Sequence, residues 1–124
     1  HGFRDRKGNL RIAAYRANEE EFLASGKYVQ RIDTPMTESG AMTVCVPLPG
    51  PGRYAIVALH DRSADGKLNV FSDGFGFTNN PKLGRSKPAV DLVAVEVRGV
   101  PAYSITLNYV QGFSAKPWPE KQTR

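Results

Sequence analysis

The chain has 124 residues with 40% hydrophobic residues, which suits one folded domain and excludes an intrinsically disordered chain. No apolar run approaches the roughly 18 residues that a membrane-spanning helix needs, and no signal peptide is recognisable in the chain. The net charge of +5 comes from scattered basic residues without a nucleic-acid-binding motif, so nucleic-acid binding is not favoured. The 12 glycines and 9 prolines favour many short strands over long helices.

The chain opens with a predicted β-hairpin. Residues 3–5 and 10–16 flank a turn at Gly8-Asn9, which supplies the positive φ that a tight turn demands. Alternation in the second strand is expected to direct three side chains into the core: Leu10, Ile12 and Ala14. Because residues 1–5 resemble the end of a strand, we expect that a preceding segment has been removed.

A short helix and an edge strand are predicted next. Asn18 can cap a helix of one or two turns over residues 17–25, and Phe22 would anchor that helix to the domain. Residues 28–36 form a less regular strand, and Pro35 indicates an edge position because proline cannot donate a ladder hydrogen bond.

The middle of the chain predicts two strands that differ in burial. Over residues 42–48 apolar side chains alternate inward, and the single cysteine, Cys45, faces away with no local base to activate it. Residues 53–61 are apolar on both faces, which is typical of a central strand covered on both sides. We expect the cover for the second face from three phenylalanines: Phe71, Phe75 and Phe77.

Two C-terminal strands complete the pattern, over residues 93–97 and 103–109. About seven alternating strands with short turns and one short helix indicate an all-β fold, an antiparallel β-sandwich. We expect a single domain over residues 1–112 and a polar tail over 113–124. Within the tail, Trp118 could either fold back onto the domain or serve as a docking point.

The loop after the central strand is a candidate calcium site. Its oxygen-bearing residues follow the first half of an EF-hand loop, with Gly66 at the bend: Asp61, Ser63, Asp65, the carbonyl of Lys67, and Asn69. Ser72 stands where the bidentate glutamate belongs, so any calcium binding would be weak. The pattern favours instead a loop whose Asp and Ser side chains bond their own backbone.

A second candidate site joins His60 to the glycine- and phenylalanine-rich segment over residues 74–81. Aromatic, Asn and Asp side chains suit carbohydrate or small polar ligands, although two asparagines before a proline also build a turn. The candidate ligand-binding residues are His60, Asp61, Phe75, Phe77, Asn79 and Asn80. Because neighbouring strand residues point to opposite faces, His60 and Asp61 cannot easily cooperate in catalysis, and a non-enzymatic protein is favoured.

The run Tyr54–Asp61, followed by residues 65–69 and 74–80, resembles the DUF2141 domain, a bacterial family of unknown function. The opening hairpin and the Pro-Gly-Arg-Tyr-Ala entry to the central strand extend this resemblance over most of the chain. The resemblance implies an immunoglobulin-like or prealbumin-like β-sandwich that is periplasmic or secreted, with no established activity. Ser63 and Asn69 replace the family's usual Asn and Asp, which weakens the metal hypothesis.

We therefore expect a non-enzymatic, exported module of the bacterial cell envelope that binds a ligand or partner, or has a structural role. The residues do not identify the partner; with the export that the resemblance implies, a cell-envelope glycan or protein is the class that we expect. Two alternatives stay open, a weak calcium-stabilised carbohydrate-binding module and a hydrolase that uses His60. No cofactor is expected, and calcium would be one only under the first of these alternatives.

Overall fold

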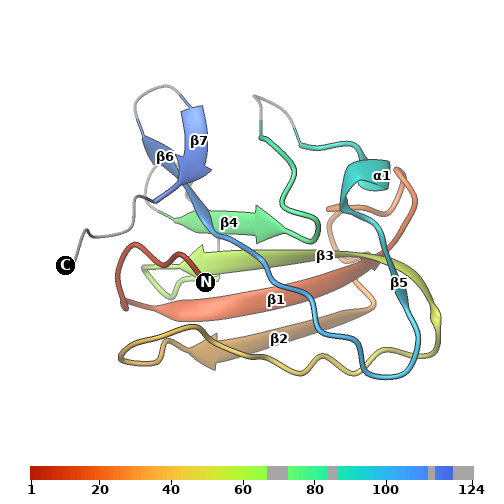
Figure 1. Ribbon diagram of the computed structural model, residues 1–124, viewed down its shortest axis with the longest axis horizontal. Coiled ribbons are helices and arrows are strands. Elements are labelled where there is room, and N and C mark those ends of the chain that lie inside the picture. The colour runs from red at the N-terminus through yellow and green to blue at the C-terminus, as the bar shows by residue number, and fades with distance from the viewer. Residues whose placement is uncertain (67–72, 84–86, 112–113, 119–124) are drawn as a thin grey trace.

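A computed structural model describes residues 1–66, 73–83, 87–111 and 114–118 (Figure 1). Within these residues the elements are β1 (Asn9–Arg16), β2 (Gln30–Pro35), β3 (Gly52–Asp61), β4 (Gly74–Phe77), α1 (Val90–Val93), β5 (Val95–Val97), β6 (Asn108–Gln111) and β7 (Ser114–Pro117). The predicted all-β class is confirmed. No helix among the described residues is long and apolar enough to cross a bilayer.

All the strands belong to one antiparallel sheet in the order β2-β1-β3-β4-β6-β7, with β5 paired to β3 outside this path. β1 pairs with residues 54–61 of β3, while β4 pairs with residues 57–60 and β5 with residues 52–54. β3 is therefore the predicted central strand. β2 lies at one end of the sheet and ends at Pro35, as predicted for an edge strand.

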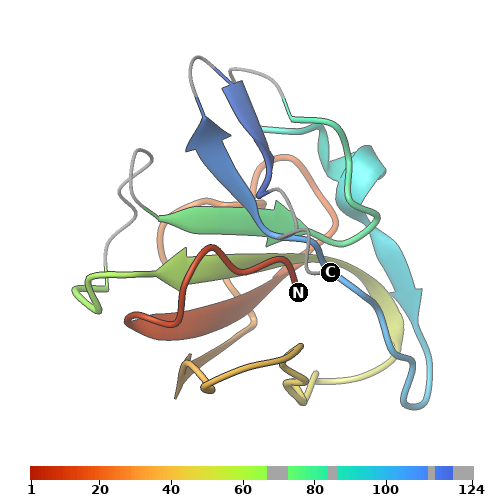
Figure 2. The ribbon, with the colours of Figure 1, turned by 60° about the vertical axis from the view of Figure 1, so that its left-hand side comes forward.

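One face of the sheet, the covered face, packs against extended chain segments. Residues 101–107 run across this face, residues 1–7 loop over one end of it, and residues 36–48 run alongside β2 (Figures 1 and 2). The buried cluster here is Leu10, Ala58, Leu107 and Tyr109, with Phe3, Ile12, Met36, Met42, Val44, Ile105 and Trp118 packed against it. Trp118 therefore folds back onto the domain, with its ring 5.8 Å from that of Tyr109.

The predicted strand over residues 42–48 is wrong, although its pattern of burial is right. Met42, Val44, Val46 and Leu48 are half-buried, and the residues between them are exposed. No ladder among the described residues includes this segment; Gln30 Nε2 donates to the carbonyl of Pro47 at 3.3 Å. Alternation determines which side chains face the core, whereas a strand also needs a neighbouring backbone within hydrogen-bonding distance.

Three other predicted elements are also corrected. Residues 3–5 form no strand, and the predicted strand over 103–109 is regular only from Asn108 onward. The predicted strand over 93–97 loses its first residue to α1 and begins at Val95. The turn predicted at Gly8 is present, with φ at +73°, and a Cβ at this position would lie 1.9 Å from the Asp61 carbonyl oxygen.

The predicted helix over residues 17–25 is a series of turns instead. Asn18 caps it as expected, since its side-chain oxygen accepts a hydrogen bond from the Glu21 N–H at 2.8 Å. Phe22 is fully buried and its N–H donates to the Asn18 carbonyl at 3.0 Å. The helical conformation does not continue past Phe22, because Leu23 adopts a positive φ of 62°. A helix of about one turn is not stable by itself.

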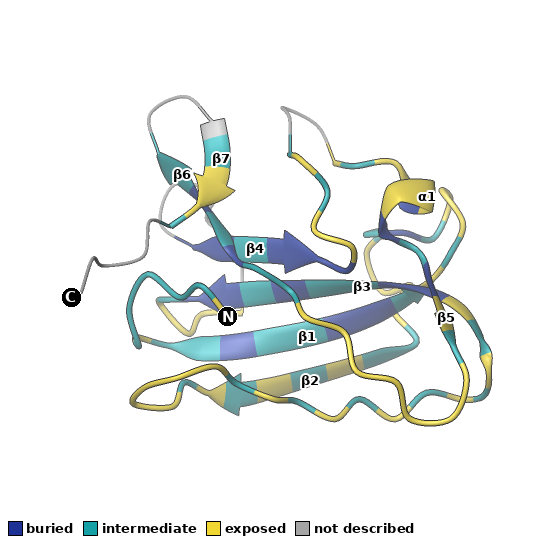
Figure 3. Cartoon of the chain, viewed as in Figure 1, coloured by how far each residue is buried: buried dark blue, intermediate teal, exposed yellow. Residues whose placement is uncertain are grey.

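The described residues cover only part of the opposite face of the sheet, the open face. Its buried cluster is Phe22, Ala55, Phe77, Val90 and Val93 (buried residues are dark blue in Figure 3). Phe75 and Phe77 do not lie over β3 as expected, because they belong to β4, which pairs beside β3. Phe71 lies outside the described residues. The remainder of the open face forms the candidate site.

Candidate functional site

The register of the sheet brings two rows of side chains together on the open face. From β2 to β4 the rows are Arg31, Ala13, Val57 and Phe77, and then Asp33, Arg11, Leu59 and Phe75. Residues that pair across antiparallel strands point to the same side of the sheet, so each row crosses four strands, roughly 14 Å at the usual strand spacing. A groove of about 400 Å³ lies over these rows.

This open-face groove is apolar at one end and positively charged at the other. Its floor toward β3 and β4 consists of Val57, Leu59, Phe75 and Phe77, and all but Phe77 are half-buried. Its rim toward β2 carries Arg11, Tyr28 and Arg31, and residues 23–26 close one side. The ligand-binding prediction included Phe75 and Phe77 among these residues and missed the others.

The two rim arginines differ in their partners. Arg11 Nε donates to Asp33 Oδ1 at 2.7 Å, and this hydrogen bond raises the pKa of the guanidinium against the effect of its partial burial. The guanidinium of Arg31 lies 4.7 Å from the ring centre of Tyr28, a cation–π contact. No carboxylate in the described part of the chain forms an ion pair with Arg31, so its charge faces solvent and the groove.

Tyr15 joins the groove to the buried cluster of the open face. It lines the groove and makes an edge-to-face contact with the buried ring of Phe22, with ring centres 6.0 Å apart. Burial raises the pKa of Tyr15, and the positive charges of Arg31 and Arg11 oppose that rise. Both arginines are therefore close enough to Tyr15 to favour a negative charge beside it.

His60 lies on the covered face and is fully buried. Its Nε2 is 2.7 Å from the Lys7 carbonyl oxygen, which can only accept, so this nitrogen carries the proton. Its Nδ1 is 2.6 Å from the Tyr109 hydroxyl, which in turn accepts from the Arg4 N–H at 3.0 Å. The Tyr109 hydroxyl can donate to Nδ1, so both nitrogens of a neutral imidazole are hydrogen-bonded in this site.

Burial lowers the pKa of His60 even though the Lys7 carbonyl and the Asp5 carboxylate act to raise it. Asp5 Oδ1 is 3.8 Å from Nε2, and Asp5 Oδ2 also accepts from Arg62 Nε at 2.7 Å. Burial would raise the pKa of Asp5, but hydrogen bonds from Arg62 and from the Lys7 N–H outweigh it and lower that pKa. Burial also raises the pKa of Tyr109 to about 12, so its hydroxyl stays protonated.

The first half of the predicted calcium loop closes on its own backbone. The carboxylate of Asp61 accepts hydrogen bonds from the Gly66 N–H at 2.7 Å and the Asp65 N–H at 3.4 Å. Ser63 Oγ also lies 3.5 Å from Asp61 Oδ1. Lys67 and Asn69 lie outside the described residues, and among the described ones no cluster of His, Cys, Asp or Glu could hold a metal ion.

Asn79 and Asn80, which were predicted to bind a ligand, hydrogen-bond neighbouring segments of the chain instead. Asn79 and Asn80 both have positive φ, at 67° and 46°, and form the turn after β4. Asn79 Nδ2 donates to the carbonyls of Leu92 and Ala94, at 3.3 and 3.1 Å. Asn80 Oδ1 accepts from the Thr106 N–H at 2.7 Å, and its Nδ2 donates to the Ser104 carbonyl at 3.1 Å.

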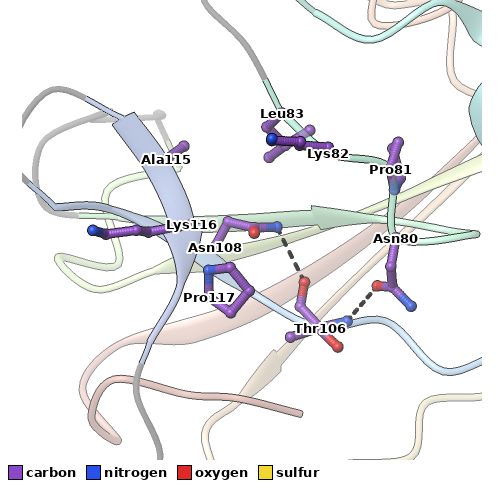
Figure 4. Close-up of a pocket in the computed structure, with 9 residues that line it drawn as sticks. All are labelled: Asn80, Pro81, Lys82, Leu83, Thr106, Asn108, Ala115, Lys116 and Pro117. Atoms are coloured by element: carbon purple, nitrogen blue, oxygen red, sulfur yellow. Dashed lines mark hydrogen bonds between the residues drawn. The ribbon is translucent and has the colours of Figure 1, made fainter.

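A second hollow of about 450 Å³ lies between residues 80–83 and the β6–β7 hairpin (Figure 4). Its charged lining residues are Lys82 and Lys116. The Asn108 amide on its floor donates to the Phe75 carbonyl at 3.1 Å and the Thr106 carbonyl at 3.3 Å. Together with Asn80, this amide is committed to the backbone, so the hollow offers a ligand less polar recognition than its composition indicates.

The open-face groove could have been only partly predicted. The apolar outward side of residues 53–61, which includes Val57 and Leu59, was a signal that this face meets something apolar. The contributions of Arg11 and Arg31 depend on pairing between β1, β2 and β3. No local pattern in the sequence specifies that register.

The chain matches a known protein family over most of its length. A family model described as an uncharacterized protein conserved in bacteria, DUF2141, matches residues 1–104. No curated protein and no solved structure matches the chain.

Proposed function

The chain belongs to the DUF2141 family of uncharacterized bacterial proteins, and we propose that it is a non-enzymatic binding module whose ligand lies in the open-face groove. The groove itself carries the proposal. Side chains from four paired strands line it, and Leu59 and Phe75 stay half-exposed on its floor. Concave, mainly apolar surfaces with a few polar groups are typical of ligand sites.

The environment of His60 supports a role without catalysis. The imidazole is fully buried, and both of its nitrogens are hydrogen-bonded within the fold. A general base must reach a proton on the substrate, and a nucleophile needs such a base beside it. Asp61 lies on the opposite side of β3 and accepts hydrogen bonds from its own loop, so it does not orient the imidazole.

We also propose that the domain is an immunoglobulin-like or prealbumin-like β-sandwich. The extended segments 36–48 and 101–107 occupy the place of a second layer over the covered face, which supports this assignment (Figure 2). The family resemblance supports export to the periplasm or the medium, where the ligand would be a component of the cell envelope.

Ligand-observed NMR tests the proposal with a panel of envelope glycans, peptides and small amphiphiles. Leu59→Gln places a polar side chain on the groove floor, and we expect it to weaken binding about tenfold, because burial of a leucine stabilises by about 1.5–3 kcal/mol. The matched control is Val100→Gln, since Val100 is 99% exposed and lies outside the groove. Absence of binding by any member of the panel, or equal affinity for wild type and Leu59→Gln, contradicts the proposal.

A further inference from the structure

The charge at one end of the open-face groove carries information about what binds there. The two rows change character from β2 to β4, since the β2 end holds Arg31 and the β4 end holds Phe75 and Phe77. A ligand that lies across the strands would meet a cation at one end and an apolar surface at the other.

The positive charge at the β2 end of the groove has no acidic lining residue to neutralise it in the described part of the chain. No Asp or Glu lines it among the described residues, and the neighbouring carboxylate, Asp33, is bonded to Arg11. Arg31 is exposed, its guanidinium lies over the face of Tyr28, and it forms no ion pair with a described carboxylate, so its N–H groups are available at the mouth of the groove. A planar guanidinium fixed on an aromatic ring is well suited to a carboxylate, sulfate or phosphate.

The apolar end of the groove has a continuous floor of small and aliphatic side chains. Ala13, the small residue between Arg31 and Val57, lies low in the sheet, and Val57 and Leu59 continue the floor toward β4. Residues 23–26 form a wall on one side. The volume of about 400 Å³ lies at the small end of the range for ligand pockets.

We propose that the groove binds a small anionic amphiphile, with its acidic group at Arg31 and its apolar body on Val57, Leu59 and Phe75. This inference rests on the proposed function and specifies the ligand class for the same site. The net charge of +5 favours the approach of an anion, and the apolar floor supplies the binding energy.

The test compares three amphiphiles with the same dodecyl chain and different heads: dodecanoate, dodecyl maltoside and dodecyltrimethylammonium. Each is titrated below its micelle concentration into ¹⁵N-labelled full chain, and binding is read from the amide shifts of β1 and β3. We expect dodecanoate to bind at least threefold more tightly than the neutral compound, with the cation weakest. Added salt should reduce the preference, since the rim arginine is exposed.

Arg31→Gln should remove most of the preference for dodecanoate, while binding of dodecyl maltoside stays unchanged. Arg98→Gln is the matched control, because it removes one exposed positive charge outside the groove and should leave both affinities as they are. Equal affinities for the three heads would overturn this inference and leave the proposed function standing. Absence of shifts in the groove with every member of the wider panel, glycans and peptides included, would overturn both.

Discussion

Replacement of His60 by alanine is the sharpest test of the buried network on the covered face. The imidazole makes two hydrogen bonds, each worth about 0.5–1.5 kcal/mol net. Its ring also makes edge-to-face contacts with Phe3 and Tyr109, at 5.8 and 5.9 Å between ring centres. The substitution loses these contacts, leaves the Lys7 carbonyl without its partner and opens a cavity, so we expect a loss of about 3–5 kcal/mol.

Urea unfolding followed by tryptophan fluorescence measures this loss, because Trp118 packs against Tyr109 and reports on the same region. The slope of the transition should not change, so the midpoint alone carries the difference in stability. His1→Ala is the matched control, since His1 is exposed, and we expect it to change the stability by less than about 0.5 kcal/mol. A loss below about 1 kcal/mol for His60→Ala would refute the assignment of His60 as a structural residue.

Three further predictions follow from described contacts. Burial lowers the pKa of His60, so the unfolded chain binds a proton on this side chain more readily than the folded chain does. The His60 contribution to stability should therefore be complete above about pH 6.5 and decrease as the pH falls below that value. Urea titrations at several pH values should show a weaker pH dependence below about pH 6.5 in His60→Ala than in the wild type. Gly76→Ala should lower the free energy of unfolding by roughly 1–3 kcal/mol in thermal unfolding, because the added Cβ would lie 2.5 Å from the Thr106 carbonyl oxygen. Gly50→Ala is the control and should leave the stability unchanged, since a Cβ there has nothing within 4 Å. Equal melting temperatures for the two variants would contradict this prediction. Asp61→Asn should lower the melting temperature in the absence of calcium, because the Asp61 carboxylate accepts hydrogen bonds from its own loop. About 10 mM calcium should leave the melting temperature of the wild type unchanged. A rise of several degrees in the wild type on addition of calcium would instead identify a weak metal site.

The local sequence pattern predicted some lining residues of the candidate site but not the role of the asparagines beside it. The sequence pointed to the segment after β3, and Phe75 and Phe77 do line the open-face groove. The side chains of Asn79 and Asn80, by contrast, connect the turn after β4 to α1 and to residues 104–106. A motif of polar residues in a loop is compatible with either use, because an amide bonds a ligand and a backbone carbonyl through the same groups.

The sequence alone determined which side chains of a segment face the core and where a tight turn occurs. The alternation over residues 42–48, the two apolar faces of residues 53–61 and the turn at Gly8 all depend on the strand period or on the φ of one residue. Tertiary structure decided which segments pair. Residues 42–48 form no ladder with a described strand, and β1 pairs with β2 and β3 in the register that aligns Arg31, Ala13 and Val57 in one row. That register results from the packing of segments distant in the chain, so the groove and its positive end exist only once the sheet has formed.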